Sequence, residues 1–157
     1  LKNINCIDSN KYRLKNLKKF KNCKTYKVDS KNIKSFIKNN YEKFDLIIDC
    51  TGSKKLIEDS FKLCKKFTGK IVIIGNTKFN EKINIKTWDI IAGKTVMGAW
   101  TNGLPKIENF RLNEKILINQ IKYIRKILPK KNFHISKINT AIESFSKGKI
   151  LRPIFKF

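Results

Sequence analysis

The first residues that could do chemistry are a carboxylate and a guanidinium near the start of the chain. Asp8 ends an apolar run that begins at Asn3, a helix-like segment follows, and Arg13 stands five positions after Asp8. In dinucleotide-binding folds, an acidic residue at the end of the second strand accepts hydrogen bonds from the adenosine ribose. A carboxylate there favours NAD, because it would repel the 2′-phosphate of NADP. Asp8 could equally be a helix cap, and Arg13 a solvated side chain.

A second group of candidate residues follows two apolar runs, at 44–50 and 70–75. Near-continuous apolar runs are typical of parallel strands that are covered on both faces. Ligands bind beyond the carboxyl ends of such strands. We therefore expect the residues there to cluster at one edge and to contact a cofactor, with loop closure as the alternative for each. They are Thr51, Gly52, Ile74, Gly75 and Asn76.

The glycine-rich phosphate turn of dinucleotide-binding folds has no counterpart in this sequence. That turn lies about 20 residues before the ribose-binding carboxylate, and only seven residues precede Asp8. Gly52, Gly69 and Gly75 are isolated and do not form a G-x-G-x-x-G pattern. We therefore expect this chain alone to bind NAD weakly or not at all.

Short strands alternate with helices over the first two thirds of the chain. Strands separated by helices in this way imply parallel βαβ units, and hence an α/β fold with a doubly wound parallel sheet. The apolar segments at Leu46, Ile73 and Val96 should then lie side by side and point the same way. The predicted strands cover 3–8, 24–28, 44–50, 70–75 and 95–99, and the predicted helices cover 9–20, 30–40 and 54–67.

The alternation of short strands with helices ends beyond Gly103. A helix is predicted over 116–128, where Pro129 stops it. A second helix is predicted over 139–146, with Gly148 as a good C-terminal cap, and a last strand over 151–157. We expect this tail to leave the sheet domain.

The charge of the chain invites a nucleic-acid interpretation, but its distribution argues against one. The chain has 157 residues, which is enough for one domain with an appendage. Its net charge is +24, from 36 basic and 12 acidic residues. Only four of the basic residues are arginines, the residue that base and phosphate recognition favours. The lysines are spread evenly, so we expect a solvated lysine surface and no specific nucleic-acid partner. A general attraction to polyanions would follow from the charge in either case.

Cysteine spacing does not predict a metal site within the chain. The cysteines are Cys6, Cys23, Cys50 and Cys64, without a C-x2-C pair, and His134 is the only histidine. Zinc-ribbon and zinc-finger spacings are therefore absent. We expect buried free thiols, which suit a reducing cytoplasm. No apolar run approaches the roughly 18 residues that a membrane span needs.

Several segments together resemble the second half of the zinc-type, medium-chain alcohol dehydrogenases. Residues 44–52 are similar to the family's "D-hydrophobic-acidic-x-x-G" strand and turn, and 69–75 to its "G-G-hydrophobic-G" strand. Residues 92–99 resemble its "G-(K/R)-x-x-x-G" strand, and 138–141 with 146–153 its "I-N-x-A … G-K-x-x-R" ending. Their order and spacing extend the resemblance over nearly the whole chain.

The resemblance implies a division of the chain and a role for each part. Residues 1–127 would form a partial Rossmann fold that lacks the first strand and the glycine-rich turn. Residues 128–157 would be the segment that returns to the catalytic domain. The chain would then be a fragment of an NAD-dependent enzyme that transfers hydride between an alcohol, or the corresponding aldehyde, and the cofactor. The family's zinc ligands would lie in an N-terminal domain, so neither catalytic residues nor metal ligands are expected here.

The resemblance also implies roles for single residues. Asp8 and Arg13 match the family's ribose-contacting pair, and Arg152 matches an arginine that can reach the pyrophosphate. The family often has paired glycines where this chain has Asn102 and Gly103. Backbone positions that face the nicotinamide are matched by Ile74, Ala99 and Thr101.

Two alternatives to a dehydrogenase fragment remain open. One is a basic module that binds polyanions or nucleic acid, which would need lysines gathered on one face with exposed aromatic residues. The other is a degenerate domain used only for association. Family members often dimerise through this sheet, so the resemblance implies a homodimer through the edge at 95–100.

Overall fold

The computed structural model describes the backbone of residues 3–99, 107–129 and 132–157. Two compact units can be distinguished, one made of Leu1–Lys31 with Ile107–Phe157 and the other of Asn32–Lys106. We call the first the outer unit, because it holds both ends of the sequence, and the second the central unit, because it holds the middle of the sequence. This division is based on contacts within the chain and does not test the predicted domain boundary between 127 and 128. That boundary stays a prediction.

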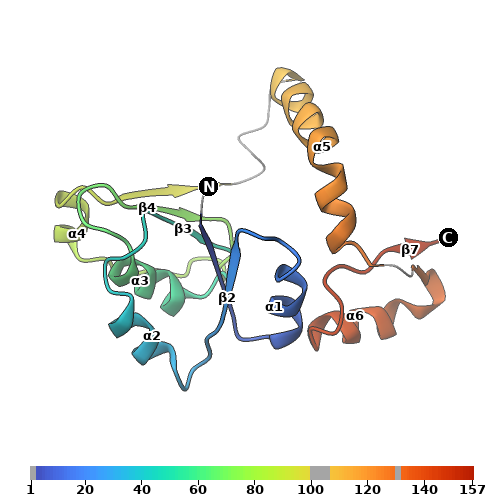
Figure 1. Ribbon diagram of the computed structural model, residues 1–157, viewed down its shortest axis with the longest axis horizontal. Coiled ribbons are helices and arrows are strands. Elements are labelled where there is room, and N and C mark those ends of the chain that lie inside the picture. The colour runs from blue at the N-terminus through green and yellow to red at the C-terminus, as the bar shows by residue number, and fades with distance from the viewer. Residues whose placement is uncertain (1–2, 100–106, 130–131) are drawn as a thin grey trace. The chain divides into compact units, whose positions relative to one another are not determined.

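A three-stranded parallel sheet forms the centre of the central unit (Figure 1). Ile71 pairs with Ile47 on one side and with Val96 on the other, all in the same direction. The predicted side-by-side arrangement of these apolar segments is therefore confirmed, and with it the α/β class with parallel strands. In sheet order the strands are β3 (Leu46–Asp49), β4 (Lys70–Ile73) and β5 (Thr95–Gly98).

One helix supplies most of the core of the central unit. Helix α3 (Lys54–Leu63) places Ile57 and Phe61 on one buried face, because residues four apart share a side of a helix. Phe61 and Cys64 pack with Ile71 of β4, and burial of each large side chain contributes roughly 1.5–3 kcal/mol. The helix ends earlier than the predicted residue 67, because Cys64 is extended and bridges to Phe44.

Two shorter helices complete the central unit. Helix α2 (Ile33–Asn39) precedes β3, as the sequence predicted. Helix α4 (Thr87–Ile91) precedes β5 and was not predicted, because five residues are too few to show an apolar repeat.

The outer unit begins with a βαβ unit. Strands β1 (Ile4–Asp8) and β2 (Cys23–Lys27) pair in parallel, and α1 (Lys11–Leu17) connects them. Asn10 is the N-cap of α1 and accepts hydrogen bonds from the backbone N–H groups of Tyr12 and Arg13. The sequence predicted a single sheet, whereas the described strands form three. In the dinucleotide-binding order another strand lies between the second and the fourth, and none of the described strands pairs with the free side of β1.

The remainder of the outer unit differs from the prediction in three places. Helix α5 (Ile107–Ile127) begins before the predicted residue 116, where its apolar positions are more widely spaced. Strand β6 (Phe133–His134) was not predicted, because two residues cannot show alternation. The predicted strand over 151–157 is only β7 (Phe155–Lys156), which pairs in parallel with β6. Between them lie η2 (Ile135–Lys137) and α6 (Ile138–Ser146).

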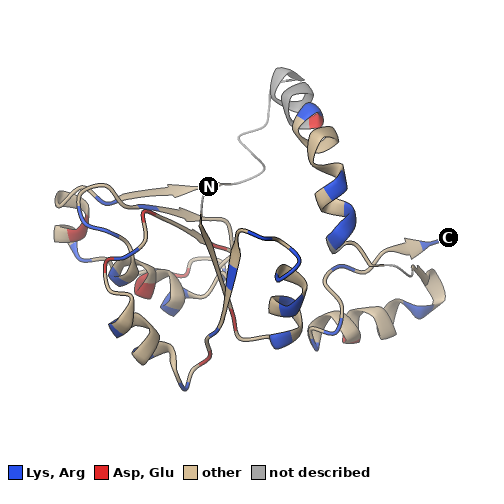
Figure 2. Ribbon diagram, viewed as in Figure 1, with Lys and Arg blue, Asp and Glu red and all other residues tan. Residues whose placement is uncertain are grey.

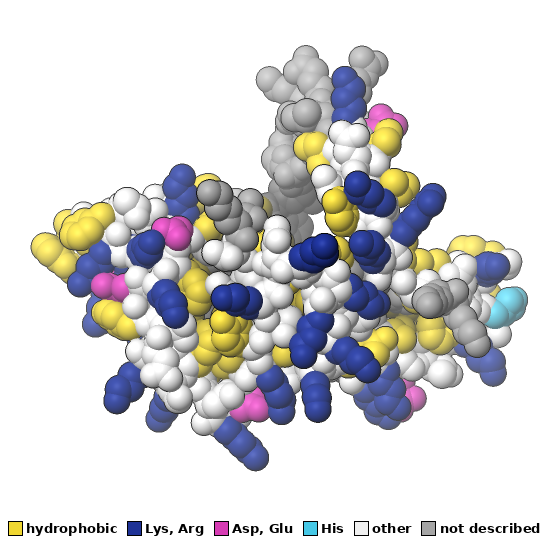
Figure 3. All heavy atoms as spheres, viewed as in Figure 1, with side chains coloured by type: hydrophobic (Ala, Val, Ile, Leu, Met, Phe, Trp, Pro, Cys, Tyr) yellow, Lys and Arg dark blue, Asp and Glu magenta, His cyan; other side chains and the backbone are white. Residues whose placement is uncertain are grey.

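Basic residues are scattered over both units (Figure 2). On the face shown in Figure 3, they are mixed with hydrophobic and uncharged atoms. Among the described helices, none combines the length and apolar character needed to cross a membrane.

Candidate functional site

The carboxyl ends of β3 and β4 meet in a close backbone contact. The N–H groups of Ile74 and Gly75 donate to the Asp49 carbonyl oxygen at 2.8 and 3.0 Å. A Cβ atom on Gly75 would lie 2.2 Å from the Gly52 nitrogen, and one on Gly52 would lie 2.1 Å from the Asn76 oxygen. The structure thus brings together the predicted residues at this edge, which we call the carboxyl rim: Thr51, Gly52, Ile74, Gly75 and Asn76.

Asp49 holds the turn that leads from β3 to the carboxyl rim. Its side chain is buried, and one carboxylate oxygen accepts from the Thr51 hydroxyl at 2.7 Å. The other accepts from the N–H groups of Thr51 and Gly52 at 3.3 and 3.2 Å. From the sequence, Asp49 was recognised only as part of a motif. The signal for its role was an acidic residue at the end of an apolar strand, three positions before a glycine.

We expect Asp49→Ala to lower the free energy of unfolding by about 1–3 kcal/mol, because it leaves partly buried donors without an acceptor. Urea denaturation followed by circular dichroism measures the change. Asp45→Ala is the matched control, since that exposed carboxylate interacts with Lys65 at the surface and should leave stability nearly unchanged. Equal losses in the two variants would show that Asp49 does not organise the turn.

Asp8 and Arg13 lie next to each other in the outer unit. One Asp8 carboxylate oxygen accepts from the Asn10 N–H at 2.7 Å, and the other lies 3.7 Å from the Arg13 guanidinium. The two side chains are 29% and 41% exposed. Asn10, rather than Asp8, caps the helix. An ionised carboxylate can accept about four hydrogen bonds, so Asp8 keeps acceptor capacity toward solvent. Its contact with a ribose stays a prediction.

The other predicted cofactor contacts are divided between the two units. The Ala99 N–H donates to the Ile73 carbonyl oxygen at 3.0 Å, so Ala99 continues the ladder of β4 and β5 beyond the strand ends. Ile74 is exposed in the central unit. Arg152 is exposed in the outer unit, in a bend after α6. Thr101 lies outside the described residues.

The described residues do not fit a zinc ion. Zinc sites in proteins need three or four Cys, His or carboxylate ligands close together. Within the ranges that the structure describes, no group of three or more such side chains could hold a metal ion. We therefore derive no chemical step through zinc from this chain.

The thiols differ from one another more than the sequence predicted. Cys64 is buried, as expected, but Cys50 is exposed, because it lies just beyond the end of β3. Partial burial and the neighbouring Asp49 charge raise the pKa of the Cys50 thiol. A raised pKa keeps Cys50 protonated near neutral pH, so it is not an activated nucleophile.

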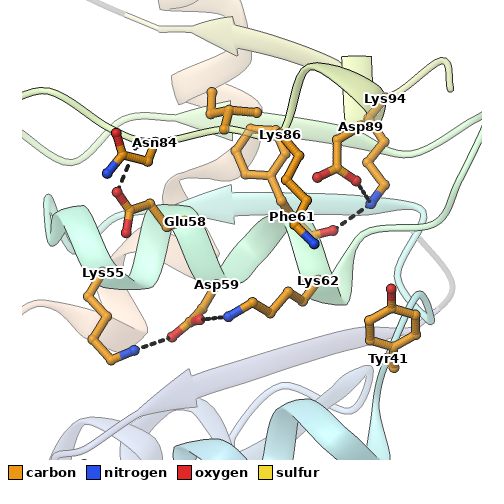
Figure 4. Close-up of a pocket in the computed structure, with 11 residues that line it drawn as sticks. Tyr41, Lys55, Glu58, Asp59, Phe61, Lys62, Asn84, Lys86, Asp89 and Lys94 are labelled. Atoms are coloured by element: carbon orange, nitrogen blue, oxygen red, sulfur yellow. Dashed lines mark hydrogen bonds and ion pairs between the residues drawn. The ribbon is translucent and has the colours of Figure 1, made fainter. Parts of the chain in front are cut away.

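A polar pocket lies on the α3 side of the central unit (Figure 4). It has a volume of about 260 Å³, and none of the carboxyl-rim residues lines it. Asp59 is buried at its wall and pairs with Lys55 at 3.1 Å and with Lys62 at 2.7 Å. Because Asp59 and Lys94 in its lining are already paired with other charged side chains, this pocket is not our candidate for cofactor binding.

Asp59 should make the stability of the chain depend on pH. Burial alone would raise the pKa of Asp59, but the hydrogen bonds and charges of Lys62 and Lys55 outweigh burial and lower it. A lowered folded-state pKa stabilises the fold above the unfolded value of about 3.9, and this contribution is lost as pH falls through the folded pKa. Asp59→Asn should therefore reduce the fall in melting temperature between pH 6 and pH 2. Glu81→Gln, at an exposed position, should leave the pH dependence of the melting temperature unchanged. An equal reduction in that variant would contradict this account.

Comparison with known proteins gives a consistent result. A family model described as zinc-binding dehydrogenase matches residues 2–116. Alcohol dehydrogenase class-3 of Caenorhabditis elegans is 25% identical over 120 residues, which are 73% of this chain and 29% of that protein. The S-(hydroxymethyl)glutathione dehydrogenase of Candida maltosa is 28% identical over 116 residues, 70% of this chain and 29% of that protein. The chain thus spans less than a third of the length of these relatives.

Two solved structures share the fold. Benzyl alcohol dehydrogenase from Acinetobacter calcoaceticus superposes with a TM-score of 0.74 at 22% identity, covering 99% of this chain and 42% of that one. An alcohol dehydrogenase zinc-binding domain protein from Burkholderia ambifaria gives 0.75 at 19% identity, with the same coverage of 99% and 42%. At these identities the likeness concerns the fold.

Proposed function

Since the chain belongs to the zinc-binding dehydrogenase family, we propose that it is the cofactor-binding part of an alcohol dehydrogenase-like oxidoreductase. The complete enzyme would transfer hydride between an alcohol, or the corresponding aldehyde, and NAD. The carboxyl rim gives the strongest support, because parallel strands end there in a close contact of Gly52 with Gly75. Ligands of open α/β sheets bind beyond such strand ends.

Each predicted site residue has a distinct task in this proposal. Asp8 accepts hydrogen bonds from the adenosine ribose hydroxyls, and Arg13 lies beside the same sugar. Arg152 reaches the pyrophosphate. When bound, NAD supplies the hydride acceptor, and the protein orients it. The nicotinamide contacts come from the backbone of Ile74, Ala99 and Thr101. Further contacts come from Thr51, Gly52, Gly75 and Asn76.

This chain holds and positions the cofactor but does not activate the substrate. In this proposal the chain supplies no catalytic residue and no metal ligand. The zinc and the pocket for the alcohol would belong to the rest of the enzyme. The free thiols suit a reducing cytoplasm. Strand β5 ends the described order of its sheet, and we propose that a second copy pairs there.

The ribose assignment predicts a specific pattern of weak binding. We expect the chain to bind NADH with millimolar affinity, because it lacks the phosphate turn, and to bind NADPH more weakly. Asp8→Ala should weaken NADH binding about tenfold, equivalent to roughly 1.4 kcal/mol, because a charged acceptor for the ribose is lost. Saturation-transfer NMR at millimolar nucleotide, in buffer of physiological salt, measures both affinities.

Asp29→Ala is the matched control, because Asp29 follows β2 much as Asp8 ends β1. It should leave NADH binding unchanged. Tighter binding of NADPH than of NADH, without an effect of Asp8→Ala, would instead indicate general polyanion binding by the basic surface. Submillimolar affinity for NADH would contradict the proposed incompleteness of the site.

A further inference from the structure

Two cysteines that are far apart in the sequence come together on the sheet of the outer unit. Cys6 of β1 pairs in register with Thr25, and Cys23 of β2 pairs with Ile4. Side chains two residues apart in a strand point to the same face. Cys6 and Cys23 are therefore diagonal neighbours on one face of a parallel pair.

The two thiols interact and neither is deeply buried. Both cysteines are half-buried and free. Burial, the Cys23 charge and a hydrogen bond with Cys23 together raise the pKa of the Cys6 thiol to about 11. We call Cys6 and Cys23 the thiol pair.

The diagonal arrangement is too wide for a relaxed disulfide. Neighbouring strands lie about 4.8 Å apart and rise about 3.3 Å per residue, so the two Cα atoms are separated by about 8 Å. Disulfides usually need about 4.4–6.8 Å between Cα atoms, and a longer span requires the backbone to move. An ion bound between the sulfurs spans more, because two metal–sulfur bonds of about 2.3 Å replace one sulfur–sulfur bond of about 2.05 Å.

We propose that Cys6 and Cys23 form a two-thiolate binding site for a soft monovalent cation, with Cu(I) as the representative ion. Thiolates favour soft ions. Zinc would require further ligands, and among the described residues no third Cys, His, Asp or Glu completes a cluster with the pair. Cu(I) accepts two ligands. The site lies on β1 before Asp8, and it does not depend on the proposed function.

Binding exchanges protons for the cation without any redox change. Each thiol loses one proton, two sulfur–copper bonds form, and Cu(I) keeps its oxidation state. The product carries one net negative charge, which the chain's net charge of +24 favours. Binding should also stabilise β1 against β2, because a ligand that binds only the folded state raises its stability.

The test is an anaerobic competition between the reduced, folded full chain and the chromogenic Cu(I) chelator bicinchoninate. We expect the wild-type chain to withdraw one Cu(I) ion per molecule. Cys6→Ser and Cys23→Ser should each weaken binding by more than about a hundredfold, since losing a supporting group near a metal already costs 10–100-fold. Cys50→Ser is the matched control and should bind like wild type. Circular dichroism confirms that each variant is folded.

Three results would overturn the proposal. The first is wild-type Cu(I) affinity in the folded Cys6→Ser or Cys23→Ser variant. The second is displacement of Cu(I) by an equal concentration of Zn²⁺, which would indicate further ligands. The third is complete conversion of the pair to a disulfide by glutathione disulfide, which is reduced to two glutathione molecules. It is read as a mass loss of two hydrogen atoms in a peptide map, and it would show that the backbone permits the shorter bridge.

Discussion

Replacing Gly75 by alanine is expected to destabilise the central unit by about 4 kcal/mol or more, a loss that few single substitutions cause. The added Cβ would lie 2.2 Å from the Gly52 nitrogen and 2.8 Å from the Cys50 carbonyl carbon and the Thr51 nitrogen. All three contacts are backbone atoms, so no side-chain rotation can relieve the clash. The carboxyl rim would have to open, and β3 and β4 would separate at their ends.

Gly98→Ala is a matched control for this substitution. Gly98 ends the neighbouring strand β5, and a Cβ there would meet no atom within 4 Å. We expect its effect on urea denaturation to stay within about 0.5 kcal/mol, as for surface substitutions. If Gly75→Ala were as stable as Gly98→Ala, the close contact of the two turns would not exist in solution.

The second large effect is expected at Lys94, the buried cation of the central unit. Its side chain is 2% exposed, and its ammonium group donates to the Phe61 carbonyl oxygen and to Asp89, both at 2.6 Å. One side chain thereby connects α3, α4 and the start of β5. We expect Lys94→Met to cost about 3–5 kcal/mol, because it leaves the Asp89 carboxylate without its buried partner.

Two further variants distinguish the ion pair from simple loss of a lysine. Lys62→Met removes an exposed ammonium from Asp59, which keeps Lys55, and should cost less than about 1 kcal/mol. Lys94→Met combined with Asp89→Leu should recover part of the loss, because no unpaired charge remains. If the loss of stability in the double variant equalled the sum of the losses in Lys94→Met and Asp89→Leu, the two side chains would not be coupled as proposed.

Apolar runs made the central sheet predictable from sequence. Strands that are buried on both faces require continuous apolar residues, and the runs around Leu46, Ile73 and Val96 meet this requirement. Glycines directly after these runs indicated the turns of the carboxyl rim, because they too can be recognised from neighbouring residues in the sequence. The parallel α/β class was therefore predicted, as was the meeting of Gly52 and Gly75.

Features that depend on register or on distant partners were not predictable. The thiol pair joins positions 17 residues apart, and only the alignment of β1 with β2 makes them neighbours. The buried acceptor at Asp49 and the buried ammonium at Lys94 both depend on partners that the chain pattern does not reveal. Likewise, the sequence could not show that Asn10, rather than Asp8, caps α1.

Amide chemical-shift mapping of NADH binding to the ¹⁵N-labelled chain tests most directly whether cofactor binds at the strand ends. We predict that the shifted amides gather at 8–13 in the outer unit and at Gly52, Gly75 and Asn76 in the central unit. The amides of Lys70 and Thr95, at the opposite ends of β4 and β5, should not move. Shifts centred on those amino ends, or distributed evenly over the lysine-rich surface, would contradict a dinucleotide site at the carboxyl rim.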